Sequence, residues 1–326
     1  MPPRNSTPSA IALRIAAVAL GLAAAVAVTE AAFRLAPSRP EPPAVAYGRI
    51  TTGERTPDFR GRRYDWSPDR RRIVVLGDSF TWGAGVDEEL SYPDRLGAAV
   101  RDRLGEQAPD VVNFSSPGWN TPQQLRALRS WFTEVRPQHL VVGYCLNDAE
   151  PTGRRIRRQL RRPFFDSPPT APAVAFLEQH SRAFAWGRGQ VLRRRQFEAV
   201  GRYYHHLYTD DAKGWRATRR ALKGLRVLAR DWGAGLTLAV FPIFEQRLDE
   251  GYRYHDLHRR VLAVAEDEGI DALDLLPAYA DQDPAAMALV PFTDAHPSAD
   301  AHAIAARVLL EHLDRRGVVA NLAGDR

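Results

Sequence analysis

Three polar residues of the chain have the types and spacing that nucleophilic acyl chemistry requires. Ser79 can attack an acyl carbon when a base removes its proton. His296 suits that task because an imidazole titrates near neutral pH. Asp294 can hold the second ring nitrogen and select the useful tautomer. We therefore predict Ser79, His296 and Asp294 as nucleophile, base and orienting acid.

The tetrahedral intermediate of such an attack needs hydrogen-bond donors for its oxyanion. We predict that the backbone N–H groups of Ser79 and Gly118 and the side-chain amide of Asn147 supply them. Two tryptophans follow Ser79 and Gly118 closely enough to wall a pocket, although core packing explains them equally well. We predict that four neighbouring residues contact substrate: Asp78, Trp82, Trp119 and Asp148.

The predicted site residues follow apolar segments of the chain. We expect these segments to form the buried elements of secondary structure that position the site. Five apolar runs predict strands: Ile73–Leu76, Val111–Phe114, Leu140–Tyr144, Leu236–Phe241 and Ala272–Leu275. Five patterns between and after them predict helices: Tyr92–Leu104, Pro122–Val135, Trp215–Trp232, Tyr252–Glu268 and Ser298–Leu313. The alternation predicts an α/β fold, a three-layer α/β/α sandwich around a mainly parallel sheet of roughly five strands. The polar motifs then gather at the carboxyl edge of that sheet.

Local signals refine two of these expectations. Gly77 is expected to let the chain turn sharply at the end of the first strand. Thr121 followed by Pro122 fits a helix N-cap with proline at the first helical position. Taken singly, Ser79 and Asn147 fit turn and capping roles. Only their joint occurrence with the late Asp–His pair favours an active site.

The order of these motifs resembles that of the SGNH or GDSL hydrolases. The resemblance covers about residues 72–318 and rests on four blocks: Gly77-Asp78-Ser79-Phe80, Asn113 to Gly118, Asn147-Asp148, and Asp294 with His296. It implies a flavodoxin-like sandwich fold and a serine hydrolase that acts on esters. We expect no cofactor and no metal. The N-terminal apolar segment also resembles that of membrane-anchored bacterial members.

The chain departs from the family pattern at two positions. Thr293 stands three residues before His296, where the family has aspartate, and Asp294 stands one residue later. One extra residue separates Gly143 from Asn147. A second Asp-x-His at residues 300–302 offers another histidine, but it is predicted to lie inside the last helix.

The amino-acid composition restricts the disulfides, metal sites and partners that the protein can have. The single cysteine, Cys145, excludes an intrachain disulfide and a cysteine-rich metal site, and we expect it to be a small buried residue. The net charge is +6, yet no nucleic-acid module accompanies it, so we expect no nucleic-acid partner. Residues 151–202 hold twelve arginines against three acidic residues. That stretch is interpreted either as a solvated face or as a surface for anionic lipid headgroups or an acidic polymer.

The N-terminus has the composition of a membrane element. Ile15–Val28 carries no charge, and Arg14 precedes it. We predict three regions: a signal anchor or transmembrane segment (1–36), a proline-rich linker and lead-in (37–71), and a hydrolase domain (72–318) with an arginine-rich helical insertion at about 152–205. Ala25-Val26-Ala27 fits a cleavage site. We favour an uncleaved anchor and an exported, periplasmic or extracellular catalytic domain, and leave the oligomeric state open.

The preferred function is a serine esterase or deacylase that cleaves O-acyl esters, with a small-molecule or glycan ester as substrate. Examples are O-acetyl groups of envelope carbohydrate or lipid. Three alternatives stay open: an acyltransferase that uses the same site, a metal-dependent phosphoesterase, and a catalytically silent polysaccharide-binding protein. An α/β-hydrolase is disfavoured because the sequence contains no G-x-S-x-G motif.

Overall fold

The computed structural model describes residues 10–36, 63–166, 170–244, 247–291 and 294–323. These residues fall into two compact units, which are described separately. One unit lies within Met1–Pro42 and Pro163–Val200, and the other within Pro43–Arg162 and Gly201–Arg326. The larger unit contains all the predicted strands.

The core of the larger unit is a parallel five-stranded sheet with the order β2-β1-β3-β4-β5. Its strands are β1 (Arg72–Gly77), β2 (Asp110–Ser115), β3 (His139–Tyr144), β4 (Gly235–Val240) and β5 (Asp271–Asp274). The central strands are covered on both faces, which explains their continuous aliphatic sequence: Ile73, Val74 and Val75 have no exposed surface. The predicted α/β sandwich is confirmed, and each predicted strand lies within one or two residues of the observed one.

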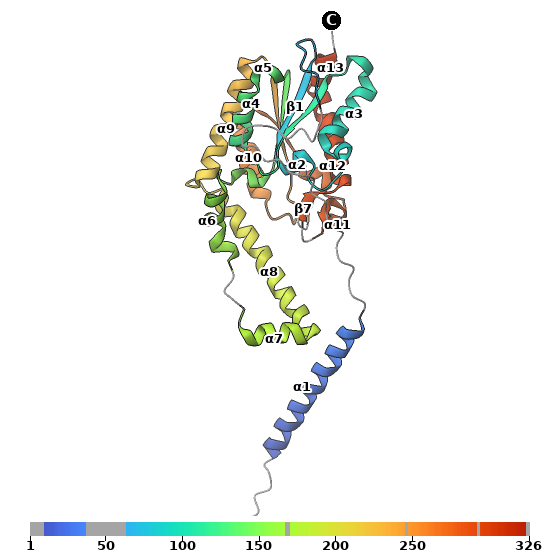
Figure 1. Ribbon diagram of the computed structural model, residues 1–326, viewed down its shortest axis with the longest axis vertical. Helices are drawn as coiled ribbons and strands as arrows, with labels where there is room; N and C mark the ends of the chain where they lie inside the picture. Colours follow the sequence, from blue (N-terminus) through green and yellow to red (C-terminus); the bar gives the residue numbers. More distant parts are fainter. Residues whose placement is uncertain (1–9, 37–62, 167–169, 245–246, 292–293, 324–326) are drawn as a thin grey trace, which may run out of the picture. The chain divides into compact units, whose positions relative to one another are not determined.

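Helices cover both faces of this sheet (Figure 1). One layer contains α4 (Thr121–Ser130), α9 (Lys213–Asp231) and α10 (His255–Asp267). The other contains α3 (Tyr92–Leu104) and α12 (Ala299–Arg315), which pack against each other. This is the arrangement that right-handed crossovers produce when the chain moves first to one side of β1 and then to the other.

The start of α4 differs by one residue from the prediction. Asn120, not Thr121, is the N-cap, because its side chain accepts a hydrogen bond from the backbone N–H of Gln123 at 3.2 Å. The Asn120 amide also donates to the carbonyl of Glu150 at 2.7 Å. This tertiary contact favours Asn120, and the sequence around Thr121 does not reveal it.

Two short antiparallel strands were not predicted. β6 (Ala288–Val290) pairs with β7 (Asp294–Pro297) just before α12. Strands of three and four residues are too short to show an alternating pattern. The late Asp–His pair therefore lies on a strand and not in a loop.

The remaining elements are connections, the insertion and the N-terminal helix. Between β3 and β4 lie α6 (Arg154–Phe165), α7 (Pro172–His180) and α8 (Arg182–Leu207). The short helices are α2 (Ser79–Trp82), η1 (Glu88–Leu90), η2 (Gly105–Gln107), α5 (Phe132–Val135), η3 (Leu146–Ala149), η4 (Leu276–Tyr279), α11 (Pro284–Met287) and α13 (Val318–Ala323).

α1 (Ala10–Leu35) is long and apolar enough to cross a membrane by length and composition, with a mean hydropathy of 2.1 over its most apolar window. Residues 37–62 of the predicted linker lie outside the described part of the chain.

Candidate active site

Ser79 lies at the first position of α2, directly after the carboxyl end of β1. Asp78 caps this short helix, and its Oδ1 accepts a hydrogen bond from the N–H of Phe80 at 2.9 Å. Gly77 is required for space: a Cβ there would lie 1.8 Å from the Thr81 Oγ1 atom. The chain does change direction after Gly77, from β1 to α2, but Gly77 has no positive φ, so the need for glycine comes from this lack of space. The close approach of α2 to β1 is what holds the Ser79 hydroxyl at the sheet edge.

β7 brings the late Asp–His pair to the same place. The His296 Nε2 atom lies 2.8 Å from the Ser79 Oγ atom, and His296 Nδ1 lies 2.5 Å from Asp294 Oδ1. The backbone N–H of His296 also donates to Asp294 Oδ1 at 3.0 Å. The His296 side chain is 25% exposed. Serine, imidazole and carboxylate thus form one continuous hydrogen-bonded chain with access to solvent.

The electrostatics of Asp294 select the histidine tautomer. Burial alone would raise the pKa of the Asp294 carboxyl, but the hydrogen bonds from the His296 side chain and backbone outweigh burial and lower that pKa below its usual value. An ionised Asp294 accepts a hydrogen bond from the Nδ1–H of His296. Nε2 of His296 is then left as an acceptor for the Ser79 hydroxyl, which is the arrangement a general base needs.

Asn147 reaches the site from η3, after the carboxyl end of β3. Its Nδ2 atom donates to the Asp78 Oδ2 atom at 2.8 Å. An amide nitrogen carries two hydrogens, so this bond orients Asn147 and leaves one N–H for a further acceptor. Asp78 has no exposed surface, and burial raises the pKa of its carboxyl. The prediction that Asp78 touches substrate is therefore corrected: it supports Asn147 and α2 from below.

Asp148 is also a supporting residue. Its carboxyl is buried and accepts hydrogen bonds from the Thr121 hydroxyl (2.9 Å), the Gln124 amide (3.0 Å) and the Cys145 N–H (3.0 Å). Burial and the neighbouring Asp78 carboxylate raise the pKa of Asp148 well above its usual value. The predicted contact of Asp148 with substrate is corrected, because this carboxyl joins η3 to α4 inside the protein.

The predicted oxyanion loop after β2 is shaped by a glycine. Gly118 has φ +79°, a conformation that side chains rarely adopt, and nothing within 4 Å would meet a Cβ there. The two tryptophans expected to wall a pocket are almost fully buried: Trp82 is 3% and Trp119 is 4% exposed. Trp119 packs on Phe114, with ring centroids 6.2 Å apart. The prediction that Trp82 and Trp119 contact substrate as walls of a pocket is therefore corrected. Both side chains pack in the core, which was the alternative explanation.

Two other candidate residues, His302 and Cys145, are buried. His302 lies inside α12 with no exposed surface, and its Nδ1 accepts from the Tyr92 N–H at 3.2 Å. Cys145 is 1% exposed, and burial raises the pKa of its thiol well above the usual value. Within the described ranges, no group of three or more His, Cys, Asp or Glu side chains is placed to hold a metal ion.

Three contributors to the site were missed from the sequence. The ring of Phe80 packs on the His296 imidazole, with centroids 5.2 Å apart. Beneath α2, the Thr81 hydroxyl and the Tyr92 phenol share a hydrogen bond of 2.9 Å. Tyr92 is far from Ser79 in sequence and lies in a predicted helix, so no spacing pattern indicated its role.

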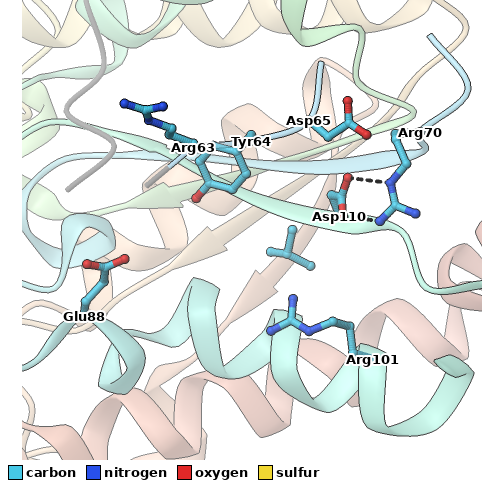
Figure 2. Close-up of a pocket in the computed structure, with 8 residues that line it drawn as sticks. Arg63, Tyr64, Asp65, Arg70, Glu88, Arg101 and Asp110 are labelled. Atoms are coloured by element: carbon cyan, nitrogen blue, oxygen red, sulfur yellow. Dashed lines mark hydrogen bonds and ion pairs between the residues drawn. The ribbon is translucent and has the colours of Figure 1, made fainter. Parts of the chain in front are cut away.

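A cavity of about 530 Å³ lies elsewhere, at the amino end of β2. Figure 2 shows Arg63, Arg70 and Arg101 around it, with Arg70 paired to Asp110 at an Nε–Oδ2 distance of 3.0 Å. None of the predicted catalytic residues lines this cavity. It is therefore separate from the serine.

The described structure thus combines an α/β/α sandwich with a hydrogen-bonded chain from Ser79 through His296 to Asp294, which is the geometry that nucleophilic attack by a serine requires. The model of the GDSL-like lipase/acylhydrolase family matches residues 75–304. The chain belongs to this family, as the resemblance predicted.

Similar solved structures include TesA and Axe2, an acetylxylan esterase from Geobacillus stearothermophilus. TesA is 19% identical, with a TM-score of 0.44, over 75% of this chain and 99% of its own. Axe2 is 18% identical, with a TM-score of 0.44, over 74% of this chain and 94% of its own. No match was found among curated proteins.

Proposed function

We propose that the protein is a serine esterase or deacylase that hydrolyses O-acyl esters. The observation that carries the proposal is the hydrogen-bonded chain Ser79–His296–Asp294, with 2.8 Å between hydroxyl and imidazole and 2.5 Å between imidazole and carboxylate. Membership of a lipase/acylhydrolase family supports the same reaction class.

The proposed reaction has two halves. In the first, the Ser79 hydroxyl proton passes to Nε2 of His296 while Oγ bonds to the acyl carbon. The intermediate collapses to an acyl-serine, and His296 returns the proton to the departing alcohol. In the second half, water loses a proton to His296 and attacks the acyl carbon. The bond between the acyl carbon and Oγ then breaks, His296 returns its proton to Ser79 Oγ, and the acid is released. Asp294 stays ionised and stabilises the imidazolium.

The oxyanion of each intermediate needs donors at its own position. We assign this role to the N–H groups of Ser79 and Gly118 and to the second Nδ2 hydrogen of Asn147. Ser79 is the first residue of α2, where backbone N–H groups have no acceptor within the helix. The bond from Asn147 to Asp78 supports the assignment, because it restrains the amide before substrate arrives.

The direct test is Ser79→Ala with a short-chain ester such as p-nitrophenyl acetate. Turnover should fall by about 10⁴–10⁶-fold while the circular dichroism spectrum is unchanged. Ser130→Ala, an exposed serine of α4, is the matched control and should retain activity. Equal activity of Ser79→Ala and the unaltered protein would overturn the proposal.

Loss of activity on adding a chelator would favour the phosphoesterase alternative instead.

The proposed substrates are O-acyl groups of envelope carbohydrate or lipid, because α1 has the length and composition to hold the protein at a membrane. We further propose that the catalytic unit is exported. Cell fractionation with protease protection tests the location, and profiling against acetylated sugars and lipid esters tests the substrate. An added sugar acceptor that diverts the acyl group from water would identify the acyltransferase alternative.

A further inference from the structure

The smaller compact unit contains a junction of three helix ends that the proposed chemistry does not use. We call it the Glu30 corner, and it comprises Glu30, Phe33, Arg34, His180, Ser181, Arg182, Ala183 and Trp186. It joins the last turn of α1 to the end of α7 and the start of α8. Its partners are about 150 residues apart in sequence, so the fold of this unit specifically brings them together.

Glu30 caps α8 from outside that helix. Its Oε1 accepts from the N–H of Arg182 at 3.0 Å, and its Oε2 accepts from the N–H of Ala183 at 3.0 Å and the Ser181 hydroxyl at 2.8 Å. The first N–H groups of a helix lack intrahelical acceptors, and a negative charge there is favourable. Without Glu30, two of these donors would lose their protein acceptor.

The capping is reciprocal. A guanidinium N–H of Arg182 donates to the carbonyl of Arg34 near the end of α1, at 3.3 Å. The Arg34 side chain donates to the carbonyl of His180 at the end of α7, at 3.0 Å. The Phe33 and Trp186 rings pack with centroids 5.3 Å apart. These contacts join α1, α7 and α8 at one point.

The corner lies where α1 would leave a membrane. The apolar stretch Ala12–Leu35 has 24 residues, and it is exposed except at Glu30 and Phe33, which are half-buried. At 1.5 Å per residue it is about 36 Å long, slightly more than the roughly 30 Å hydrocarbon core of a bilayer. If α1 spans a bilayer, Glu30 and Arg34 fall near the headgroup region, and the residues bonded to them lie there too.

The surface of α7 and early α8 has the chemistry of a lipid interface. Phe176 is 59%, Trp186 is 51% and Val191 is 52% exposed. Exposed large apolar groups mark interaction sites, and tryptophan is favoured at membrane interfaces. The same stretch carries five arginines: Arg182, Arg188, Arg193, Arg194 and Arg195. Near an anionic leaflet each such charge strengthens binding.

We propose that residues 172–195, which we call the interfacial segment, bind the headgroup layer of an anionic phospholipid membrane, and that Glu30 holds the segment at the point where α1 emerges. It follows that α1 is retained as part of the folded protein, since its removal would uncap α8. This inference does not depend on the proposed esterase activity.

The first test uses the full-length chain in phosphatidylcholine vesicles, with or without phosphatidylglycerol. A fluorophore is attached at Phe176→Cys and quenched by lipids that carry a headgroup nitroxide. The native Cys145 is 1% exposed and should stay unlabelled. Vesicles of phosphatidylcholine alone are the matched control. We expect quenching at position 176 that increases with phosphatidylglycerol. Quenching at position 176 that is absent, or that does not depend on phosphatidylglycerol, would overturn the proposal.

The second test removes the capping acid. Glu30→Ala should reduce quenching at position 176 and make proteolysis of the interfacial segment about tenfold faster, because charged capping bonds are lost. Glu198→Ala, an exposed acid on α8, is the control and should change neither. Hydrolysis of a soluble ester should be unchanged in both variants, which separates this result from the esterase proposal.

Three outcomes would contradict the account. One is a mature chain, sequenced from membranes, that begins after residue 27. Another is wild-type quenching and proteolysis in Glu30→Ala. A third is a position-176 label that is shielded by self-association of the protein and never by lipid, which would assign the exposed apolar surface to a second copy of the chain.

Discussion

Two of the hydrogen-bonded chains of aspartate, histidine and hydroxyl in the described part of the larger unit have the same order of groups, and they differ mainly in what surrounds them. In the first, Asp294 and His296 lead to Ser79. In the second, Asp274 Oδ1 lies 2.9 Å from Nδ1 of His258, whose Nε2 lies 3.3 Å from a phenol, that of Tyr252. By bond pattern alone, the two are nearly interchangeable.

The two chains differ in how far their histidines are exposed to solvent. The His258 side chain is 1% exposed, whereas that of His296 is 25% exposed. The Tyr252 oxygen also accepts from the N–H of Ile243 at 2.9 Å, inside the protein. The buried chain fastens α10 to the end of β5. A carboxylate, an imidazole and a hydroxyl in a hydrogen-bonded row are therefore not sufficient for the proposed reaction. The hydroxyl must also be accessible to substrate, and hydrogen-bond donors for the oxyanion must lie near it.

The largest contrast should come from the two histidines. His296→Gln removes the base and should lower kcat/KM by about 10⁴-fold without unfolding the protein. His258→Gln should retain activity and lower the free energy of unfolding by about 1–3 kcal/mol, because buried partners lose their hydrogen bonds. Ester hydrolysis and urea denaturation measure the two effects. Inactivation by His258→Gln in a folded protein would break the comparison.

The oxyanion donors should give the next largest effect. Asn147→Ala should lower kcat by about 10²–10³-fold, with a smaller change in KM, because the donor acts on the transition state. Tyr252→Phe, which removes the hydroxyl of the buried chain, should leave kcat unaltered. Steady-state kinetics on the same ester distinguish them. An unchanged kcat for Asn147→Ala would remove this residue from the oxyanion hole.

A smaller effect should follow from crowding α2 against β1. Gly77→Ala places a Cβ atom 1.8 Å from Thr81 Oγ1, so α2 must shift and Ser79 with it. The cost should be about 1–3 kcal/mol of unfolding free energy, with a partial loss of kcat. Gly187→Ala, where a Cβ meets nothing within 4 Å, is the control. Wild-type stability of Gly77→Ala would contradict the packing argument.

The last contrast concerns the pH dependence of stability and another buried imidazole, that of His139. Burial lowers the pKa of His139 to about 4, from a usual value of 6.5. The unfolded chain therefore binds a proton at His139 more tightly than the folded protein does. For this reason the neutral His139 ring contributes fully to the free energy of unfolding above pH 6.5, and this contribution is lost as the pH falls from 6.5 through 4. The loss should reach about 3 kcal/mol.

Urea unfolding at pH 7 and pH 4 should show this loss in the native protein and a smaller one in His139→Gln. Asp294 contributes to the free energy of unfolding over a lower pH range. Its pKa in the folded protein is below the usual value of 3.8, so its contribution is complete above pH 3.8 and disappears only in stronger acid. An identical pH dependence in His139→Gln would show that this imidazole is not responsible.

The sequence predicted the fold well because buried parallel strands are continuous aliphatic runs separated by amphipathic helices. It did not reveal β7, because four residues carry no usable period, nor the Asn120 cap, which depends on a bond to Glu150. It predicted Ser79 and His296 through their order along the chain. It could not separate Asp78 and Asp148 from substrate-contacting residues, because their burial arises from packing of distant segments.

We propose Ser79, and no other hydroxyl, as the activated nucleophile. An alkyl fluorophosphonate reacts with such a serine, and peptide mass spectrometry locates the adduct. We expect one adduct, on Ser79, formed at the normal rate in His258→Gln and much more slowly in His296→Gln. An adduct at another residue, or an unlabelled Ser79 in a protein that still hydrolyses esters, would contradict this proposal.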